Sequence, residues 1–262
     1  MNPILSFPLF NPAQKCNVRM LRWAAVLAAG LLSACSSPEG GAEFHDPFEE
    51  QNREVHNANR DLDRTVVRPV SRTYGTAVPA PVRKGVSNFS SNLDLPGMVV
   101  NDLLQFRPVD AMTNAARFLF NSTVGIAGLF DPATSIHLYE RDTDFGETLN
   151  VWGFGEGAYV ELPLLGPSTE RDAVGKIVDV ALNPTRLFLP VGVRNTGTGA
   201  GIAKQIGDRY EYSDTVDSVL YESADSYAQA RLLYLQNRRF ELGANSESEP
   251  DYADPYEDLY AE

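Results

Sequence analysis

Residues 46–66, DPFEEQNREVHNANRDLDRTV, begin the folded part of this chain with a helical pattern whose inward face is partly polar. Asp46 suits the N-cap position and Pro47 the first helical position, so we expect the helix to begin there. At helical spacing, the inward positions are Phe48, Asn52, Val55, Asn59, Leu62 and Val66. Two interpretations are open. Either the asparagines bond neighbouring loops and fix one packing arrangement, or this face is wet because it lines a polar passage.

Prolines divide the next part of the chain. They stand at positions 69, 79, 81, 96 and 108, and each removes a backbone donor and disfavours helix at the residue before it. Helical apolar spacing recurs over residues 81–92, 97–106 and 110–121. The sequence therefore predicts several short amphipathic helices between residues 66 and 121.

Two apolar segments rich in glycine follow these helices. Residues 123–130, TVGIAGLF, are too short to span a bilayer, and they predict either a turn in the core or a segment at a membrane interface. Residues 144–166 interleave glycine with aromatic and leucine side chains, which predicts a small hairpin-like segment. Ser168 or Thr169 then suits the N-cap of a further helix.

The last third of the chain combines a predicted loop with a long predicted helix. Residues 195–201, rich in glycine and threonine, predict a loop. The longest helical pattern runs from Asp214 to about Leu242. We therefore expect one mostly α-helical domain over residues 46–242. Residues 243–262 are acidic and lack aliphatic periodicity, so we expect a disordered tail.

A short apolar run with a cysteine at its end precedes the helical region. Leu32-Ser33-Ala34-Cys35 follows the apolar residues 23–32, with two arginines before them. This pattern is a lipobox, in which the cysteine is acylated and becomes the mature N-terminus. The run is about ten residues long, half of what a spanning helix needs. We expect residues 1–34 to be a signal peptide, with Met20 as an alternative start, and residues 35–45 to be a tether that carries the acyl and diacylglycerol groups on Cys35. Ser36, where an aspartate would signal retention in the inner membrane, indicates the outer membrane, facing the periplasm.

Charge and cysteine content restrict the possible functions. The chain has 22 basic and 35 acidic side chains and a formal net charge of −13, which argues against nucleic-acid binding. Cys35 is the one cysteine that remains after removal of the signal peptide, so the mature chain cannot form an internal disulfide.

Fragments that resemble catalytic motifs lack the surroundings that those motifs require. Asp144-Phe145-Gly146 matches the metal-binding tripeptide of protein kinases, but no glycine-rich loop or HRD loop precedes it. GTGAG at residues 197–201 departs from the dinucleotide-binding pattern. The three histidines show no metal-ligand spacing. We therefore expect no catalytic residues, no metal and no dissociable cofactor.

A series of short motifs runs in order through residues 46–180. They are Asp46-Pro47, Asn52-Arg53, Arg117-Phe118, Asn121, Asp131, Asp144-Phe145-Gly146, Trp152-Gly153 and Arg171-Asp172. In this order they resemble the MlaA family (also called VacJ) of outer-membrane phospholipid-transport lipoproteins. The resemblance is dense over residues 46–180 and looser over 185–240. So many ordered matches are more specific than any single motif.

The resemblance implies a fold, a function and a set of partners. The fold would be a ring of short amphipathic helices around a central channel, set in the inner leaflet of the outer membrane. The chain would passively remove phospholipids mislocalised to the outer leaflet, which maintains lipid asymmetry. It would work beside a trimeric porin and hand its phospholipid cargo to the periplasmic carrier MlaC. In the family the first helix borders the channel, which makes Asn52, His56 and Asn59 candidate channel-lining residues.

Two other functions are the alternatives. One is a lipid-modifying hydrolase, which would need an activated nucleophile that the sequence does not display. The other is a structural lipoprotein that braces a porin without transporting lipid.

Overall fold

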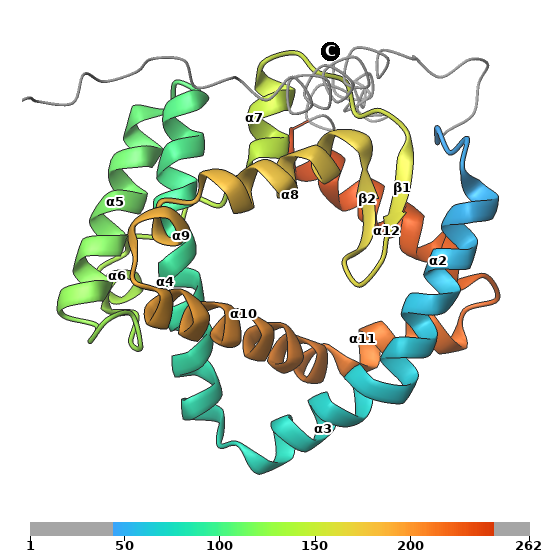
Figure 1. The fold of residues 1–262 in the computed structure, drawn as a ribbon, viewed down its shortest axis with the longest axis horizontal. Helices are drawn as coiled ribbons and strands as arrows, with labels where there is room; N and C mark the ends of the chain where they lie inside the picture. Colours follow the sequence, from blue (N-terminus) through green and yellow to red (C-terminus); the bar gives the residue numbers. More distant parts are fainter. Residues whose placement is uncertain (1–43, 244–262) are drawn as a thin grey trace, which may run out of the picture.

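The computed structural model describes residues 44–243, and these are mostly helical, as predicted (Figure 1). The signal peptide, Cys35, most of the tether and nearly all of the acidic tail lie outside the described residues. The elements are, in chain order, α2 (Glu49–Leu62), a first π-turn (Asp63–Val67), α3 (Arg68–Ala77), α4 (Ala80–Leu104), α5 (Pro108–Thr123), α6 (Pro132–Ser135), α7 (Phe145–Val151), β1 (Tyr159–Leu162), β2 (Gly166–Thr169), α8 (Glu170–Leu182), α9 (Pro184–Phe188), α10 (Val191–Glu211), α11 (Ser213–Asp217), a second π-turn (Ser218–Glu222) and α12 (Ser226–Glu241).

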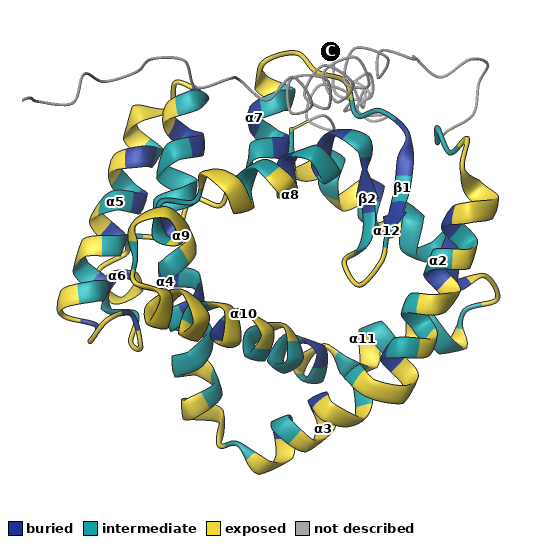
Figure 2. Cartoon of the chain, viewed as in Figure 1, coloured by how far each residue is buried: buried dark blue, intermediate teal, exposed yellow. Residues whose placement is uncertain are grey.

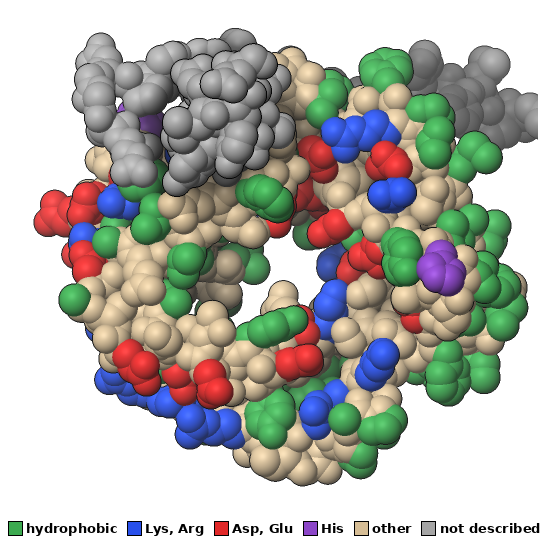
Figure 3. All heavy atoms as spheres, turned by 180° about the vertical axis from the view of Figure 1, so that it is seen from behind, with side chains coloured by type: hydrophobic (Ala, Val, Ile, Leu, Met, Phe, Trp, Pro, Cys, Tyr) green, Lys and Arg blue, Asp and Glu red, His purple; other side chains and the backbone are tan. Residues whose placement is uncertain are grey.

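The elements surround a central opening. In Figure 1, α4 and α5 form one side, α7 and α8 the top, the β1–β2 hairpin with α12 and α2 the opposite side, and α3 and α10 the bottom. The space-filling view in Figure 3 is also open at the centre. No helix within residues 44–243 combines the length and the apolar content that crossing a bilayer requires.

The first helix is longer than predicted because Pro69 does not end it. Helix continues from Glu49 to Ala77 through the first π-turn, in which the Arg68 N–H donates to the Asp63 carbonyl five residues earlier. A π-turn widens the helix, and this gives the proline ring the room that it lacks in a regular α-helix. The expected N-cap at Asp46 is wrong, since the helix begins at Glu49 and no side chain caps it.

The second correction concerns Pro96, which lies inside α4 instead of separating two helices. An internal proline costs roughly 3 kcal/mol, and packing must offset this. Here α4 packs along both α5 and α10, with Leu95 almost fully buried. The chain breaks only around Pro79 and before Pro108, where α4 and α5 begin. The predicted helix over residues 110–121 is confirmed as part of α5.

Residues 124–130, directly after α5, form a turn with exposed apolar side chains. Ile126, Ala127 and Gly128 have positive φ angles, and Gly128 approaches Asn92 so closely that a Cβ would lie 2.6 Å from the Asn92 Cβ. Val124, Ile126 and Phe130 are exposed. These side chains are not core residues, which favours the interpretation as an interfacial segment.

The hairpin is shorter than predicted and begins later in the chain. Residues 145–151 form α7, and the antiparallel strands β1 and β2 pair Tyr159 with Thr169 and Leu162 with Gly166. The predicted N-cap is confirmed, because the Thr169 side chain accepts from the Asp172 N–H at 3.2 Å.

The C-terminal helices divide differently from the prediction. The predicted loop at 195–201 is helical and lies inside α10, where Gly197 packs closely against Leu93 of α4. Tertiary packing thus overrides the low helix propensity of glycine and threonine. The long pattern from 214 to 242 is interrupted at residues 223–225, and Asp225 caps α12 by accepting from the Ala228 N–H.

The interior of the molecule is largely polar. Figure 2 shows buried positions scattered as narrow bands along the helices, with no large central core. The apolar core cluster of the described residues consists of Tyr159, Tyr227 and Leu235, with Phe44 and Tyr234 packed against it. Most other buried side chains are polar or charged and are held by hydrogen bonds. The apolar cluster joins β1 to α12, and this fixes the hairpin beside the opening.

Candidate functional site

The central opening is the candidate site, because elements from the whole chain meet around it. In Figure 1 the turn of the hairpin extends toward the opening, and α8 and α10 lie along its upper and lower edges. Figure 3 shows acidic and basic side chains together at its rim. The residues predicted from sequence fall into three groups around this opening.

Asn52 connects α2 to the edge of strand β1. Its side-chain amide donates to the Tyr159 carbonyl at 3.0 Å, and its amide oxygen accepts from the Glu161 N–H at 2.9 Å. Asn52 is 5% exposed. The side chain therefore makes the two hydrogen bonds that a neighbouring strand would make with β1.

Asn59 repeats this arrangement farther along the same helix. It donates to the Leu162 carbonyl at 2.9 Å and accepts from the Leu164 N–H at 2.8 Å. Seven residues of α-helix advance about 10 Å, and three residues of strand also advance about 10 Å. The spacing of Asn52 and Asn59 thus matches the spacing of the two backbone sites on the hairpin. We call these two residues the asparagine clasp.

His56 lies between the two asparagines on the same face of α2. Its ring nitrogens lie 3.3 Å from Glu161 Oε1 and 3.1 Å from Ser226 Oγ, and the side chain is 3% exposed. The placement of Asn52 and His56 favours the interpretation that polar residues of this helix bond a neighbouring segment. Neither side chain is open to a passage, so they do not match the prediction of direct channel lining. For the half-buried Asn59 that role stays a prediction.

Asp46 and Arg53 tie the start of α2 to α12. Asp46 accepts hydrogen bonds from Asn52 at 3.0 Å, from the Tyr227 hydroxyl and from Arg231, with which it forms an ion pair. Arg53 pairs with Asp225 at 2.8 Å, and its hydrogen bonds lower the pKa of Asp225 to about 2. Pro47 is exposed in the turn that precedes the helix.

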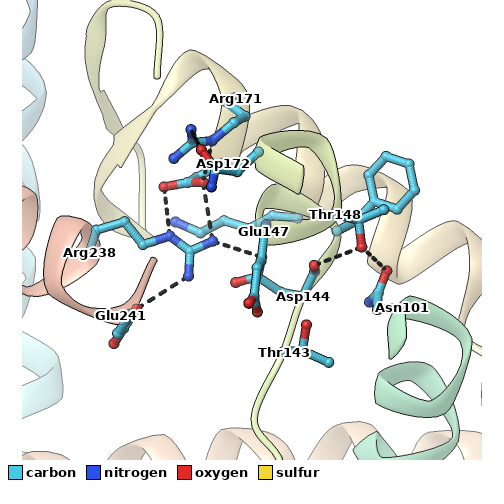
Figure 4. Close-up of polar contacts among 12 residues, drawn as sticks. Asn101, Thr143, Asp144, Glu147, Thr148, Arg171, Asp172, Arg238 and Glu241 are labelled. Atoms are coloured by element: carbon cyan, nitrogen blue, oxygen red, sulfur yellow. Dashed lines mark hydrogen bonds and ion pairs between the residues drawn. The ribbon is translucent and has the colours of Figure 1, made fainter. Parts of the chain in front are cut away.

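Arg238 organises the second group of predicted residues (Figure 4). Its guanidinium lies between Asp144 of the α7 N-terminus, at 2.7 Å, and Asp172 of α8, at 3.1 Å. Asp144 also caps α7 by accepting from the Glu147 N–H at 2.7 Å. Burial alone would raise the pKa of Asp172, but hydrogen bonds from Tyr234 and Arg238 and the charge of Arg238 outweigh this and lower it.

The kinase-like tripeptide has a structural explanation in this setting. The Phe145 N–H donates to Asp179 of α8 at 3.1 Å. Gly146 lies where α7 crosses α8, since a Cβ on Gly175 would come within 2.5 Å of the Gly146 nitrogen. Asp144, Phe145 and Gly146 therefore cap α7, attach it to α8 and allow the close crossing.

Trp152 and Gly153 end α7 and attach it to α4. Gly153, at φ +89°, and Phe154 donate to the Asn150 and Leu149 carbonyls, which is a Schellman C-cap. The Trp152 indole donates to the Leu104 carbonyl at 3.1 Å. Arg171, next to Asp172, donates to the Asn150 side chain at 2.8 Å.

The third group fixes the turn after α5. Arg117 pairs with Asp131 at 3.1 Å, and Asn121 donates to the same carboxylate at 2.9 Å. Asn121 also accepts from the Ala133 N–H at 3.1 Å. Phe118, on the same helix, is half-buried. The group holds the exposed apolar turn of residues 124–130 against α5.

An acidic cavity of about 360 Å³ lies between α4, α8, α10 and the segment before α7. Its lining includes Asp94, Glu140, Asp142, Asp179 and Lys204. Burial raises the pKa of all four of these carboxyl groups. No group of three or more side chains within residues 44–243 is arranged to hold a metal ion. The cavity adds charged lining to the interior but offers no metal centre.

Several residues of these networks were not predicted from the sequence. Arg238, Glu161 and Lys204 each lie far along the chain from their partners, on segments with no distinguishing motif. For the asparagine pair, the sequence predicts bonds to a neighbouring loop or a polar passage, but it does not identify the hairpin as the partner. The one signal available for Arg238 was its position in the last turn of a helix, which many surface arginines share.

Comparison with known proteins gives consistent matches over most of the chain. The sequence model of the family described as "MlaA lipoprotein" matches residues 44–241. The intermembrane phospholipid transport system lipoprotein MlaA of Escherichia coli (strain K12) is 34% identical over 232 residues, 86% of this chain and 88% of the relative. The protein of the same name from Haemophilus influenzae is 28% identical over 243 residues, 87% of this chain and 94% of the relative.

A solved structure is also similar. It is described as "Structural basis for maintenance of bacterial outer membrane lipid asymmetry", and it superposes with a TM-score of 0.66 at 34% sequence identity. The match covers 75% of this chain and 98% of that chain. Fold and sequence thus point to the same group of proteins.

Proposed function

Since this chain belongs to the MlaA lipoprotein family, we propose that it is a passive phospholipid conduit of the outer membrane. It removes phospholipids mislocalised to the outer leaflet and passes them to a soluble periplasmic carrier, which maintains lipid asymmetry. Relatives are named for an intermembrane phospholipid transport system, which supports this activity.

The observation that carries the proposal is the contrast between the outer surface and the central opening. Large apolar side chains are exposed at the end of α4 and along α5, among them Phe106, Val109, Met112 and Leu119. Figure 3 shows such hydrophobic side chains gathered over one flank, and charged side chains at the rim of the opening. An apolar flank suits contact with the acyl chains of a leaflet, and charged side chains at the rim of the opening suit a lipid headgroup.

The free energy of lipid exposure explains why such a body is needed. Each CH₂ group moved from lipid into water costs about 0.8 kcal/mol, so two acyl chains face a barrier on the order of tens of kcal/mol. A conduit lowers that barrier by giving apolar cover to the chains and a polar path to the headgroup. No chemical step on the lipid is required, so we propose no enzymatic activity and no cofactor for this chain.

The hairpin turn is the element that we propose contacts the acyl chains. Leu164 and Leu165 are exposed at the turn, which extends toward the opening in Figure 1. Asn59 of the asparagine clasp fixes this turn through the Leu162 carbonyl and the Leu164 N–H. In this arrangement Asn52, His56 and Asn59 shape the passage by holding the hairpin.

We also propose the location and the partners. Acylation at Cys35 anchors the N-terminus in the outer membrane on the periplasmic side, and the exposed apolar surface holds the body in the same leaflet. A trimeric porin is the proposed neighbour in the membrane, and MlaC is the proposed recipient of the lipid.

A transfer assay tests the conduit. The lipidated protein in vesicles that contain labelled phospholipid is mixed with the soluble carrier, and the lipid on the carrier is identified by mass spectrometry. Intact phospholipid on the carrier supports the proposal. Lysolipid or free fatty acid would favour the hydrolase, and tight porin binding without transfer would favour the structural brace.

A pair of variants at one position locates the path. Leu164→Asp should slow transfer because it puts a charge where acyl chains pass, whereas Leu164→Met keeps an apolar side chain of similar size and should transfer normally. Equal transfer by the two variants would exclude the hairpin turn from the path.

A further inference from the structure

Two π-turns that are far apart in the sequence lie against each other at one corner of the molecule. The first joins α2 to α3 without a break, and the second follows α11. Tyr221 of the second π-turn donates its hydroxyl to Asp63 Oδ2 at 2.7 Å, and the Arg68 guanidinium lies 4.9 Å from the centre of the Tyr221 ring. π-Turns interrupt regular helical hydrogen bonding, occur frequently at functional sites and are common points of helix bending.

Arg209 of α10 bridges the two π-turns. It donates to both carboxylate oxygens of Asp63, at 2.9 and 2.8 Å, and to Asp217 Oδ1 at 2.6 Å. Asp63 is the first residue of the first π-turn, and Asp217 directly precedes the second. Arg209 is 9% exposed. We call this arrangement the Arg209 clamp.

Arg209 and Arg68 together balance the two carboxylates of the clamp in the folded protein. Burial alone would raise the pKa of Asp63, but hydrogen bonds from Arg209 and Tyr221 outweigh it and lower the pKa. The same balance lowers the pKa of Asp217, which also accepts a hydrogen bond from Arg68. Both carboxylates are therefore ionised at neutral pH, and removing the guanidinium would leave two negative charges close together.

The Arg209 clamp lies where two halves of the molecule meet. Helices α3, α4, α5 and α10 pack chiefly against one another, while α2, α7, α8, α12 and the hairpin form the other half. The halves lie on opposite sides of the central opening in Figure 1. Across the opening from the clamp, Asn101 and Leu104 of α4 bond Asp179 of α8 and Trp152 after α7. Within residues 44–243, these hydrogen bonds join the halves on one side of the opening, and the clamp joins them at the corner that contains both π-turns.

We infer that the two π-turns form a hinge and that the Arg209 clamp holds it closed. Release of the clamp allows α2 to change its angle to α3, and this changes the width of the opening. The hinge follows from the geometry alone. Its effect on lipid passage rests on the proposed function.

Spin labels at the two ends of the continuous helix test the hinge directly. Glu50→Cys and Thr76→Cys place labels at exposed positions before and after the first π-turn. Twenty-six residues of straight helix span about 39 Å, which suits pulsed electron paramagnetic resonance, and bending shortens this distance. The wild-type background should give one narrow distance distribution, and Arg209→Gln should broaden it or shift it by several Å.

A matched control separates the hinge from general destabilisation. Arg117 is a buried arginine that pairs with Asp131 inside one half of the molecule. Arg117→Gln should lower stability but leave the 50–76 distance unchanged. A folded Arg209→Gln variant with the wild-type distribution would overturn the hinge, as would the same broadening in Arg117→Gln.

A milder variant covers the case in which Arg209→Gln does not fold. Arg209→Lys keeps a positive charge but loses the planar fork that bonds both Asp63 oxygens and Asp217. A broadened distribution then supports the hinge, and an unchanged one refutes it. Phospholipid transfer is measured in the same samples. Absence of transfer in the wild type counts against the conduit and not against the hinge, because the distance measurement does not depend on transport.

Discussion

Replacement of Asn52 by alanine is the sharpest test of how the hairpin is held. The side chain satisfies the Tyr159 carbonyl and the Glu161 N–H, and both residues are buried. Asn52→Ala would leave two buried backbone groups without partners. Each such group costs about 1–3 kcal/mol, so the free energy of unfolding should fall by about 2–6 kcal/mol. Asn59→Ala should cost less, about 1 kcal/mol, because water can reach the half-buried site.

Urea unfolding followed by circular dichroism measures the free-energy change, and amide hydrogen exchange locates it. The Glu161 amide should lose protection in Asn52→Ala before the rest of the protein does. Asn57, which is exposed on the same helix, provides the matched control, and Asn57→Ala should change stability by no more than about 0.5 kcal/mol. Equal effects of the changes at positions 52 and 57, or full protection of the Glu161 amide, would refute the clasp.

Three further predictions concern packing, pH and anchoring. Gly175→Ala should cost about 1–3 kcal/mol or more in thermal or urea unfolding, because its Cβ would meet the Gly146 backbone at 2.5 Å, while Gly199→Ala, with open space around it, should be neutral or stabilising. Equal effects would contradict the close α7–α8 crossing. Burial raises the pKa of Asp102 to about 6, so its ionisation destabilises the fold as pH rises from about 4 to 6. Relative to Asp102→Asn, the wild type should lose up to about 3 kcal/mol between pH 4 and pH 7 in urea titrations, and parallel pH profiles would disprove this. Cys35→Ala should leave the protein unacylated and mislocalised, and normal outer-membrane fractionation would disprove the anchor.

Local signals in the sequence predicted much of the secondary structure correctly. The helical character and the helix of residues 110–121 follow from apolar periodicity. The Thr169 cap follows from one side chain that bonds a backbone N–H three residues later. The family could also be recognised from the order of its motifs. These features depend on neighbours in the sequence, so the sequence alone is sufficient to find them.

The errors occur where tertiary packing overrides a local preference. Pro69 and Pro96 lie inside helices because a π-turn accommodates one and packing against α5 and α10 offsets the other. The glycine-rich residues 195–201 are helical because the small side chains let α10 approach α4. Asp46 does not cap its helix because Tyr227 and Arg231, which lie far along the chain, bond its carboxylate.

The sequence by itself determined that the fold is mostly helical and that the chain belongs to a family of lipoproteins. Helical periodicity, the lipobox and the family motifs can be read from it because each is a pattern among residues close together in the chain. Only the tertiary structure decided what the polar residues do. The two asparagines of the first helix face the backbone of a hairpin about a hundred residues away, and Arg209 bridges two π-turns. Such pairings depend on which segments meet in space, and the residue types alone allow many partners for each asparagine and arginine.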